Sequence, residues 1–225
     1  MRKYYAEKLA AERLKKCYEI ASPRVKMYLK AEVDFVLTKI QPIDLVLDLG
    51  CGYGRIIPYL ARHAGCVVGI DNSFPSLLLG KEFLRSVPNT LLLEMDAARL
   101  AFRDDSFDVV ICIQNGISAF HIDQRQLIRE AVRVAKPGGR ILFSTYSEKF
   151  WEHRLEWFER QSEAGLLGEI DQEKTGNGII ICKDGFKATT VGPEEFLALA
   201  SPLNMETQII EVDESSLFYE IKKAD

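Results

Sequence analysis

The stretch that decides the fold is Val46-Leu47-Asp48-Leu49-Gly50-Cys51-Gly52-Tyr53-Gly54-Arg55, a short apolar run that opens into three closely spaced glycines. A run of this kind is typical of a buried parallel strand. The glycines allow the backbone to turn sharply and to approach a ligand closely. Ligands of open α/β sheets bind beyond the carboxyl ends of the strands, so this turn is a predicted binding site.

The chain on either side of the turn alternates between strand and helix patterns. We predict strands at residues 45–49, 66–70, 91–94, 107–113 and 140–145, and helices between them at 55–64, 75–85 and 123–135. Continuously apolar strands that alternate with helices predict a doubly wound, mostly parallel α/β sheet of the Rossmann-like type. Two later strand patterns, at 205–212 and 216–221, give this sheet seven strands with an antiparallel end.

The remaining segments predict additions to a single domain that spans residues 1–225. Apolar residues recur at helical spacing through the first 40 residues, which predicts helices there, with Ser22 as an N-cap before Pro23 and a helix end at Gln41-Pro42. A helix at 151–164, a hairpin around Asp184-Gly185 and a helix at 193–200 follow the core. We therefore expect four parts: a helical lid (1–41), a cofactor-binding core (42–146), a substrate cap (147–203) that includes the hairpin, and terminal strands (204–225).

The spacing of the glycines and one acid indicate the kind of ligand. A dinucleotide-binding fingerprint has its third glycine at the position that Arg55 occupies here, so a nicotinamide dehydrogenase is disfavoured. Asp71 ends the second strand, 21 residues after Gly50. An acid at this position accepts hydrogen bonds from both hydroxyls of a ribose. The pattern favours an adenosine-type ribose without a diphosphate.

Five segments in this order resemble the class I S-adenosylmethionine-dependent methyltransferases, and more narrowly the small-molecule enzymes with a type 11 or type 25 methyltransferase domain. The resemblance covers about residues 42–146 and rests on segments 46–54, 69–71, 94–97, 105–110 and 133–139. Each segment alone is common, but five in the family's order and spacing are a specific signal. The resemblance implies S-adenosylmethionine as cofactor and S-adenosylhomocysteine as product.

The resemblance also implies a set of cofactor-binding residues. Asp48 belongs to the loop, Asp71 binds the ribose and Asp96 accepts the adenine amino group. Tyr18 and Tyr28 precede the first motif, in a segment that folds over the cofactor in similar enzymes. The full set is Tyr18, Tyr28, Asp48, Gly50, Cys51, Gly52, Tyr53, Gly54, Arg55, Asp71, Asn72, Asp96, Ala97, Ile113 and Asn115. The alternative for the polar members is an ordinary cap, turn or helix-surface role.

The segment after the fourth strand, residues 114–121, bears on the methyl acceptor. It lacks the Asn/Asp-Pro-Pro-Tyr/Phe motif of many enzymes that methylate bases or amides, and Cys112 lacks the preceding proline of cytosine-C5 enzymes. It is more similar to small-molecule N- or O-methyltransferases. His121, Tyr146 and His153 are candidate general bases, which a hydroxyl acceptor would need more than an amine or thiol. Structural roles are the alternative for all three.

Composition sets the remaining expectations for the 225-residue chain, which carries a net charge of −4. No apolar run exceeds five residues and the amino terminus lacks a signal-peptide pattern, so we expect a cytoplasmic protein with no membrane partner. Five scattered cysteines without metal-ligand spacing predict no metal.

The charges are unevenly distributed along the chain. Residues 1–40 carry ten Lys and Arg against five Asp and Glu, and residues 191–225 carry two against eight. The basic segment favours an anionic small-molecule acceptor, with a solvated helix face as the alternative. An RNA or protein methyltransferase and a non-catalytic S-adenosylmethionine-binding regulatory protein are the competing functions, and the oligomeric state is open.

Overall fold

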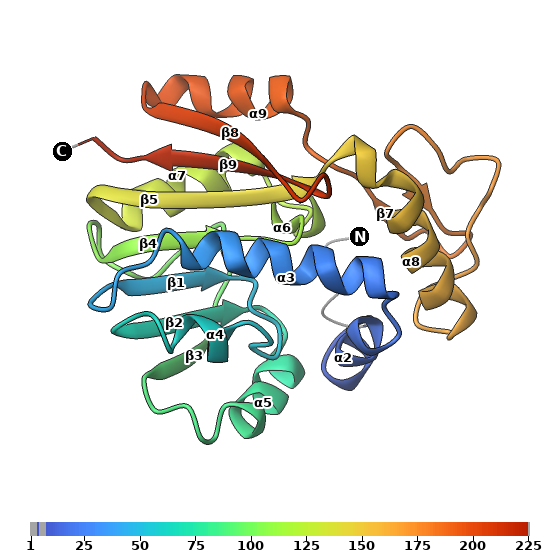
Figure 1. Cartoon of the computed structure of the whole chain (residues 1–225), viewed down its shortest axis with the longest axis horizontal. Helices are drawn as coiled ribbons and strands as arrows, with labels where there is room; N and C mark the ends of the chain where they lie inside the picture. Colours follow the sequence, from blue (N-terminus) through green and yellow to red (C-terminus); the bar gives the residue numbers. More distant parts are fainter. Residues whose placement is uncertain (1–3, 5–7, 225) are drawn as a thin grey trace.

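A computed structural model describes residue 4 and residues 8–224 (Figure 1), so residues 1–3 and 5–7 of the predicted lid lie outside the described part. Seven strands form one sheet in the order β3-β2-β1-β4-β5-β9-β8. The first five pair in parallel, and β9 runs antiparallel to both of its neighbours. The strands are β1 (Leu45–Leu49), β2 (Cys66–Asp71), β3 (Thr90–Glu94), β4 (Phe107–Cys112), β5 (Ala135–Tyr146), β8 (Glu206–Val212) and β9 (Ser216–Lys222). The predicted fold class is confirmed.

Helices cover both faces of the sheet because its central strands are apolar on both sides. In Figure 1, α3 (Pro23–Leu37) and α4 (Ile57–Leu60) lie in front of the sheet, and α6 (Gly116–Ala119) and α7 (Gln124–Val134) lie behind it. Val46 of β1 packs in the front cluster and Leu47 in the rear cluster. The two remaining core helices are α5 (Phe74–Phe83), which follows β2, and α9 (Pro193–Ala200), which packs in the rear cluster.

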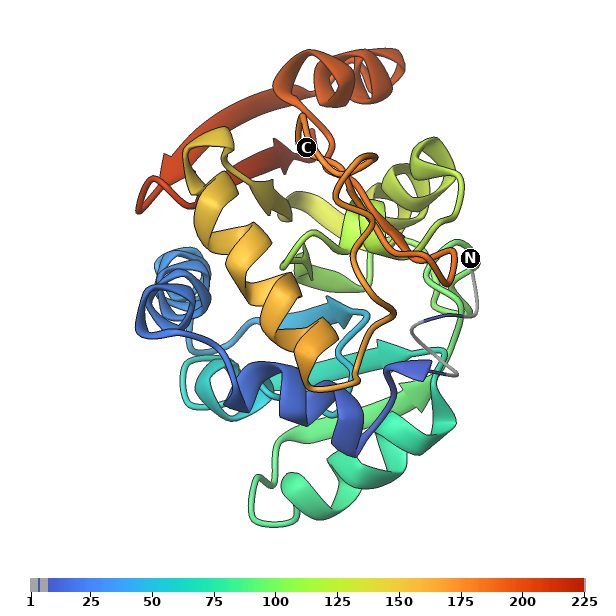
Figure 2. The ribbon, with the colours of Figure 1, turned by 90° about the vertical axis from the view of Figure 1, so that its right-hand side faces the viewer.

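A third layer crosses the carboxyl ends of the parallel strands. Figure 2 shows α2 (Glu12–Glu19) and α8 (Trp151–Glu163) in front of this end of the sheet. A short hairpin of β6 (Ile180–Ile181) and β7 (Lys187–Ala188) lies beside α8, and the short helices η1 (Glu148–Phe150) and η2 (Ser201–Leu203) are the remaining elements in the described part of the chain. Trp157 Nε1 donates a hydrogen bond of 2.8 Å to Cys17 O, which joins α8 to α2. The order of the strands reverses between β1 and β4, directly beneath this layer.

Side-chain caps explain where several helices begin. Ser22 Oγ accepts a hydrogen bond from Val25 N, and Pro23 is the first residue of α3, as the sequence predicts. Asp123 Oδ1 accepts from the backbone N–H groups of Arg125 and Gln126 and so caps α7. No helix among the described residues is long and apolar enough to cross a membrane.

The structure differs from the local sequence predictions in three places. The helix predicted at 55–64 is reduced to α4, and the residues on either side form turns with hydrogen bonds that span three residues, from Ile57 N to Gly54 O and from His63 N to Leu60 O. The strand predicted at 140–145 begins earlier, at Ala135 of β5, and residues 136–139 form a bulge inside it, opposite Asp108, whose two oxygens bind Lys136 Nζ at 2.8 Å. The short helix α6 was not predicted.

Candidate active site

The glycine turn after β1 has a conformation that requires glycine. Gly50, Gly52 and Gly54 have φ values of 76°, 56° and 77°. The N–H groups of Gly50 and Cys51 both donate to Ile70 O, at 2.8 and 2.9 Å, which fixes the turn to the end of β2. A Cβ atom on Gly50 would lie 2.3 Å from Cζ of Phe120. The turn is therefore held to the end of β2, and Phe120 packs directly against Gly50.

Asp71 at the end of β2 holds the same turn from the other side. Its Oδ2 accepts a hydrogen bond from Gly52 N and its Oδ1 accepts one from Ser73 N, both at 2.8 Å. Burial raises the pKa of Asp71, and the hydrogen bonds from the backbone oppose that rise. Each oxygen has a second lone pair that these bonds leave available.

Two adjoining cavities lie beside this turn, at the point where the strand order reverses. Asp71, Asn72, Asp96 and Ala97 belong to the wall of the larger cavity. The smaller cavity has Asp48 and Arg55 in its wall. The residues that border both cavities, which we call the junction, are Leu14, Tyr18, Gly50, Gly52, Ile113 and Gln114. A ligand that fills both cavities must pass this junction.

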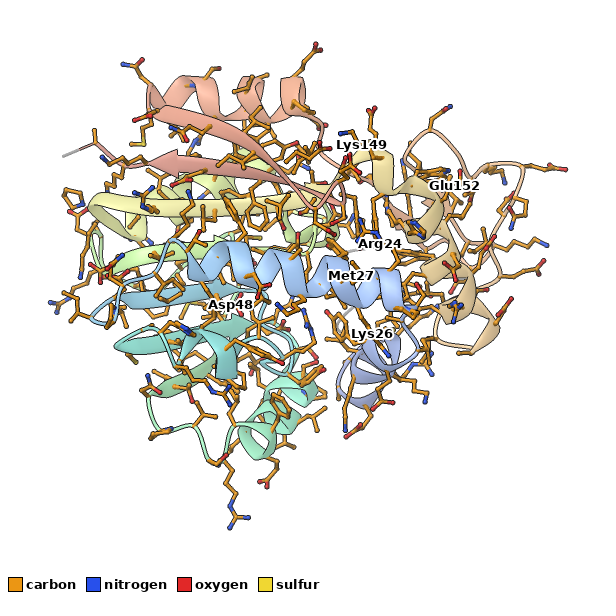
Figure 3. All side chains as sticks on the ribbon, viewed as in Figure 1. Arg24, Lys26, Met27, Asp48, Lys149 and Glu152 are labelled. Atoms are coloured by element: carbon orange, nitrogen blue, oxygen red, sulfur yellow. The ribbon has the colours of Figure 1, made fainter. Side chains whose placement is uncertain are left out.

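The smaller cavity contains an acid and a base whose hydrogen-bonding capacity is incompletely used. Asp48 lies on the central strand β1 (Figure 3), and its Oδ2 is buried without a hydrogen-bond partner among the described residues. Arg55 Nη2 is also buried without a hydrogen-bond partner among the described residues, and the guanidinium lies 4.5 Å from the centre of the Tyr18 ring. Burial raises the pKa of Asp48 to about 7, the negative charge of Asp71 adds to the rise, and Arg55 opposes it. Such a pair suits a ligand that carries both an ammonium and a carboxylate group.

Helix α2 covers the two cavities. Tyr18 Oη donates a hydrogen bond of 2.9 Å to Gln114 Oε1, directly across the junction. Ala11 N donates to Ser76 Oγ at 2.9 Å, which ties the start of α2 to α5. Leu14 packs so closely on the glycine turn that a Cβ atom on Gly52 would lie 2.8 Å from its Cδ2. These contacts place the helix where the sequence predicts a lid.

Most of the predicted cofactor-binding residues come together at the cavities. Those in the cavity walls are Tyr18, Asp48, Gly50, Cys51, Gly52, Tyr53, Arg55, Asp71, Asn72, Asp96, Ala97 and Ile113. Gly54 belongs to the same turn without bordering either cavity. Asp96 Oδ1 accepts a hydrogen bond from Ala98 N at 2.9 Å.

Two other members of the predicted set lie outside both cavities. Tyr28 is fully buried, and its ring centre lies 5.3 Å from that of Tyr146. Asn115 precedes α6, where its Oδ1 accepts from Thr145 Oγ1 and its Nδ2 donates to Thr189 O, both at 2.8 Å. Their positions give both residues packing roles and do not support contact with a cofactor in the cavities.

None of the three candidate bases borders either cavity. His121 lies between two wall residues, and partial burial lowers the pKa of its imidazole. Tyr146 is buried, and that burial raises the pKa of its phenol. His153 is on α8 with its side chain 46% exposed, 3.9 Å from Glu156. The structure does not bring these three groups to the junction.

Sequence reasoning missed two residues that shape the site. Gln114 has φ 55°, borders both cavities and holds the Tyr18 hydroxyl. Glu32 of α3 is fully buried; its Oε2 accepts from Gln114 N at 3.1 Å and its Oε1 from Ser216 Oγ at 2.6 Å. The sequence signal that could have indicated Glu32 is the presence of a charged residue within the apolar stripe of a predicted helix.

The sheet order, the glycine turn and the acid at the end of β2 define a class I methyltransferase fold, in which S-adenosylmethionine is the cofactor. Residues 46–139 match the family model described as "Methyltransferase domain". The PH0226 protein of Pyrococcus horikoshii OT3 has the same fold, with a TM-score of 0.67 and 23% identity over 91% of this chain and 93% of that one.

Two curated relatives are similar to part of the chain. One is the malonyl-[acyl-carrier protein] O-methyltransferase of Marinomonas sp. (strain MWYL1), 36% identical over 110 residues, which are 47% of this chain and 39% of the relative. The other is the 2-methyl-6-phytyl-1,4-hydroquinone methyltransferase of Synechocystis sp. (strain ATCC 27184 / PCC 6803 / Kazusa), 30% identical over 148 residues, 58% of this chain and 46% of the relative. The chain thus spans less than half the length of these relatives.

Proposed function

We propose that this protein transfers a methyl group from S-adenosylmethionine to a nitrogen, oxygen or sulfur atom of a small-molecule acceptor. The observation that carries the proposal is the pair of buried, incompletely bonded groups, Asp48 and Arg55, in a cavity that adjoins the Asp71 cavity. S-adenosylmethionine likewise has two parts, because its sulfur joins an adenosine, which would fill the Asp71 cavity, to an α-amino acid, which would fill the smaller cavity.

The residues present fit the two halves of this cofactor. In the smaller cavity, Asp48 would bind the ammonium group and Arg55 the carboxylate, so each would gain the partner it lacks. In the larger cavity, the second lone pairs of Asp71 would accept the ribose hydroxyls. Asp96 would accept the adenine amino group beside Ala97. The sulfur would then lie at the junction, beside Tyr18 and Gln114.

When bound, the cofactor would supply a methyl group on its sulfonium: a lone pair of the acceptor would bond to the methyl carbon in line with the breaking C–S bond, and S-adenosylhomocysteine would leave. The protein contributes orientation and the exclusion of water. The glycine turn and Asp71 fix the position of the adenosine half, and the Tyr18–Gln114 hydrogen bond closes α2 over the junction. Because the three candidate bases lie away from the junction, an acceptor that attacks without a protein base, such as an amine or a thiolate, is favoured over a neutral hydroxyl.

The names of the relatives support a small-molecule acceptor. The Marinomonas relative is named for a malonyl group carried by a protein, and the Synechocystis relative for a substituted hydroquinone. Both acceptors are organic groups of modest size, so we assign this chain the same broad acceptor class.

Two assays test the proposal. Calorimetric titration with S-adenosylmethionine, S-adenosylhomocysteine and NAD is expected to show binding of the two adenosyl sulfur compounds and none of NAD. Incubation with isotopically labelled S-adenosylmethionine and a panel of amines, thiols, phenols and carboxylic acids is expected to label one acceptor class. Failure to bind either adenosyl compound would refute the proposal. Transfer only to RNA or protein, or binding without transfer, would favour the competing functions.

A further inference from the structure

The chain passes through two consecutive left-handed residues where β4 ends at the junction. Gln114 has φ 55° and the next residue, Asn115, has φ 62°. A residue with a Cβ atom rarely adopts this conformation, because the Cβ atom crowds the following carbonyl oxygen. A strained backbone of this kind persists only where the surrounding contacts hold it, so the groups that hold this turn bear on the site.

Contacts from three other parts of the chain hold this turn. The Asn115 side chain accepts a hydrogen bond from β5 and donates one to Thr189 O, both at 2.8 Å. Gln114 N donates to two oxygens, Ser144 Oγ of β5 at 2.8 Å and Glu32 Oε2 of α3 at 3.1 Å. Glu32 is the one carboxylic acid in this set of contacts, and it holds the backbone of Gln114 directly.

Glu32 holds the turn at a cost to the protein. Its side chain is fully buried, and that burial raises the pKa of its carboxyl group. Hydrogen bonds from two serines and from Gln114 N, together with the positive charge of Arg55, oppose the rise. An apolar side chain of the same size would fill this position without burying a carboxyl group. The carboxyl group therefore supplies a fixed hydrogen-bond acceptor that packing alone does not require.

The conformation of the turn determines where the Gln114 side chain lies. Gln114 borders both cavities, and its Oε1 accepts the hydrogen bond of 2.9 Å from Tyr18 Oη. Tyr18 belongs to α2, the helix that covers the junction. Glu32 itself borders neither cavity, so its hydrogen bond to the Gln114 backbone is its connection to the site.

We propose that Glu32 is a positioning residue for the methyl transfer. Its carboxyl group accepts the Gln114 N–H and holds the left-handed turn, and the turn places the Gln114 amide where it bonds to Tyr18 and closes α2 over the junction. Glu32 acts on the cofactor through these two residues and does not touch it. This inference rests on the proposed function, because the site that Glu32 shapes is the one assigned to S-adenosylmethionine.

A double-mutant cycle, measured by calorimetric titration with S-adenosylhomocysteine, tests the inference. Glu32→Met keeps the size of the side chain and removes the acceptor, so we expect it to weaken binding about three- to tenfold, as the loss of one hydrogen bond does. In a protein that already carries Tyr18→Phe, Glu32→Met should weaken binding less than about twofold, because the bond that it positions is already absent. A role in stability alone would give the same change in both backgrounds.

Two conservative variants of Glu32 test whether the position of its oxygen matters. Glu32→Gln keeps an oxygen that can accept from Gln114 N, and Ser216 Oγ can donate to Thr145 O, 3.2 Å away, in place of the carboxyl group. This variant should bind S-adenosylhomocysteine within about twofold of the natural protein. Glu32→Asp keeps the charge but withdraws the oxygens by one methylene group, so it should lose affinity as Glu32→Met does. Both variants keep the inference testable if Glu32→Met does not fold.

Asp34→Met is the matched control, because Asp34 lies on the same helix with its side chain 54% exposed, and it should leave the affinity unchanged. Natural affinity in Glu32→Met and Glu32→Asp, equal losses with and without Tyr18→Phe, or a tenfold loss in Glu32→Gln would overturn the inference. Failure of the natural protein to bind S-adenosylhomocysteine would refute the proposed function itself, so the two failures are distinguishable.

Discussion

The affinity for S-adenosylhomocysteine is predicted to fall about tenfold between pH 8 and pH 6, because Asp48 must be ionised to bind the ammonium group of the ligand. Burial and the neighbouring charge of Asp71 raise the pKa of Asp48 to about 7 in the empty protein. An ammonium group beside the carboxylate lowers that pKa, so the ligand prefers the ionised form. The bound complex therefore holds fewer protons than the free protein near neutral pH.

The magnitude follows from the ionised fraction of Asp48. With a pKa of about 7, about ten molecules in eleven are ionised at pH 8 and about one in eleven at pH 6. Each binding event should release close to one proton at pH 6 and almost none at pH 8.

Isothermal titration calorimetry in two buffers of different ionisation enthalpy measures both quantities. Asp48→Asn is the control, because the amide has the size of the carboxyl group and cannot titrate. The variant is expected to bind more weakly at pH 8 and to show a flat profile. Equal affinity of the natural protein at pH 6 and pH 8, or the same pH profile in the variant, would refute the reasoning.

Three further changes test other parts of the account. The free energy of unfolding without ligand should fall by about 3 kcal/mol between pH 5 and pH 8, because the raised pKa of Asp48 lets the folded state hold a proton that it loses as the pH rises through 7. Denaturant titration should show a smaller fall in Asp48→Asn, and an equal fall in the variant would contradict the assignment of this pH dependence to Asp48. Gly50→Ala should abolish S-adenosylhomocysteine binding in calorimetry and lower the melting temperature, because φ is 76° and the added Cβ would meet Phe120; unchanged binding would show that the turn is adaptable. Tyr18→Phe should weaken S-adenosylhomocysteine about three- to tenfold and speed hydrogen exchange in α2, because it deletes the bond to Gln114, whereas Tyr59→Phe on the exposed surface should do neither.

The parts of the site that sequence predicts are those that depend on short stretches of chain. The turn of residues 50–54 follows from glycine spacing after an apolar strand, and Asp71 follows from its place at the end of the next strand. Parallel pairing brings these two segments together without further information, since Asp48 of β1 is opposite Gly69 of β2. The N-cap at Ser22 is equally local.

The parts that sequence did not predict depend on packing between distant elements. Glu32 is 82 residues from Gln114, and their contact exists only because α3 crosses the front of the sheet above β4. Tyr28 looked like a lid residue because it precedes the first motif, yet the aromatic neighbours Tyr146 and Phe150 draw it away from the cavities. Arg154 is fully buried although it lies on a charge-rich helix, which no periodicity indicates.

The central claim is that one ligand, S-adenosylmethionine, fills both cavities and is held at its ribose by Asp71. Calorimetric titration of S-adenosylmethionine into the natural protein and into Asp71→Ala tests it most directly, with Asp34→Ala as a control at an exposed position that borders neither cavity. We expect one binding site per chain in the natural protein and in the control, and an affinity at least about tenfold lower in Asp71→Ala. No binding to the natural protein, or equal affinity in all three proteins, would contradict it.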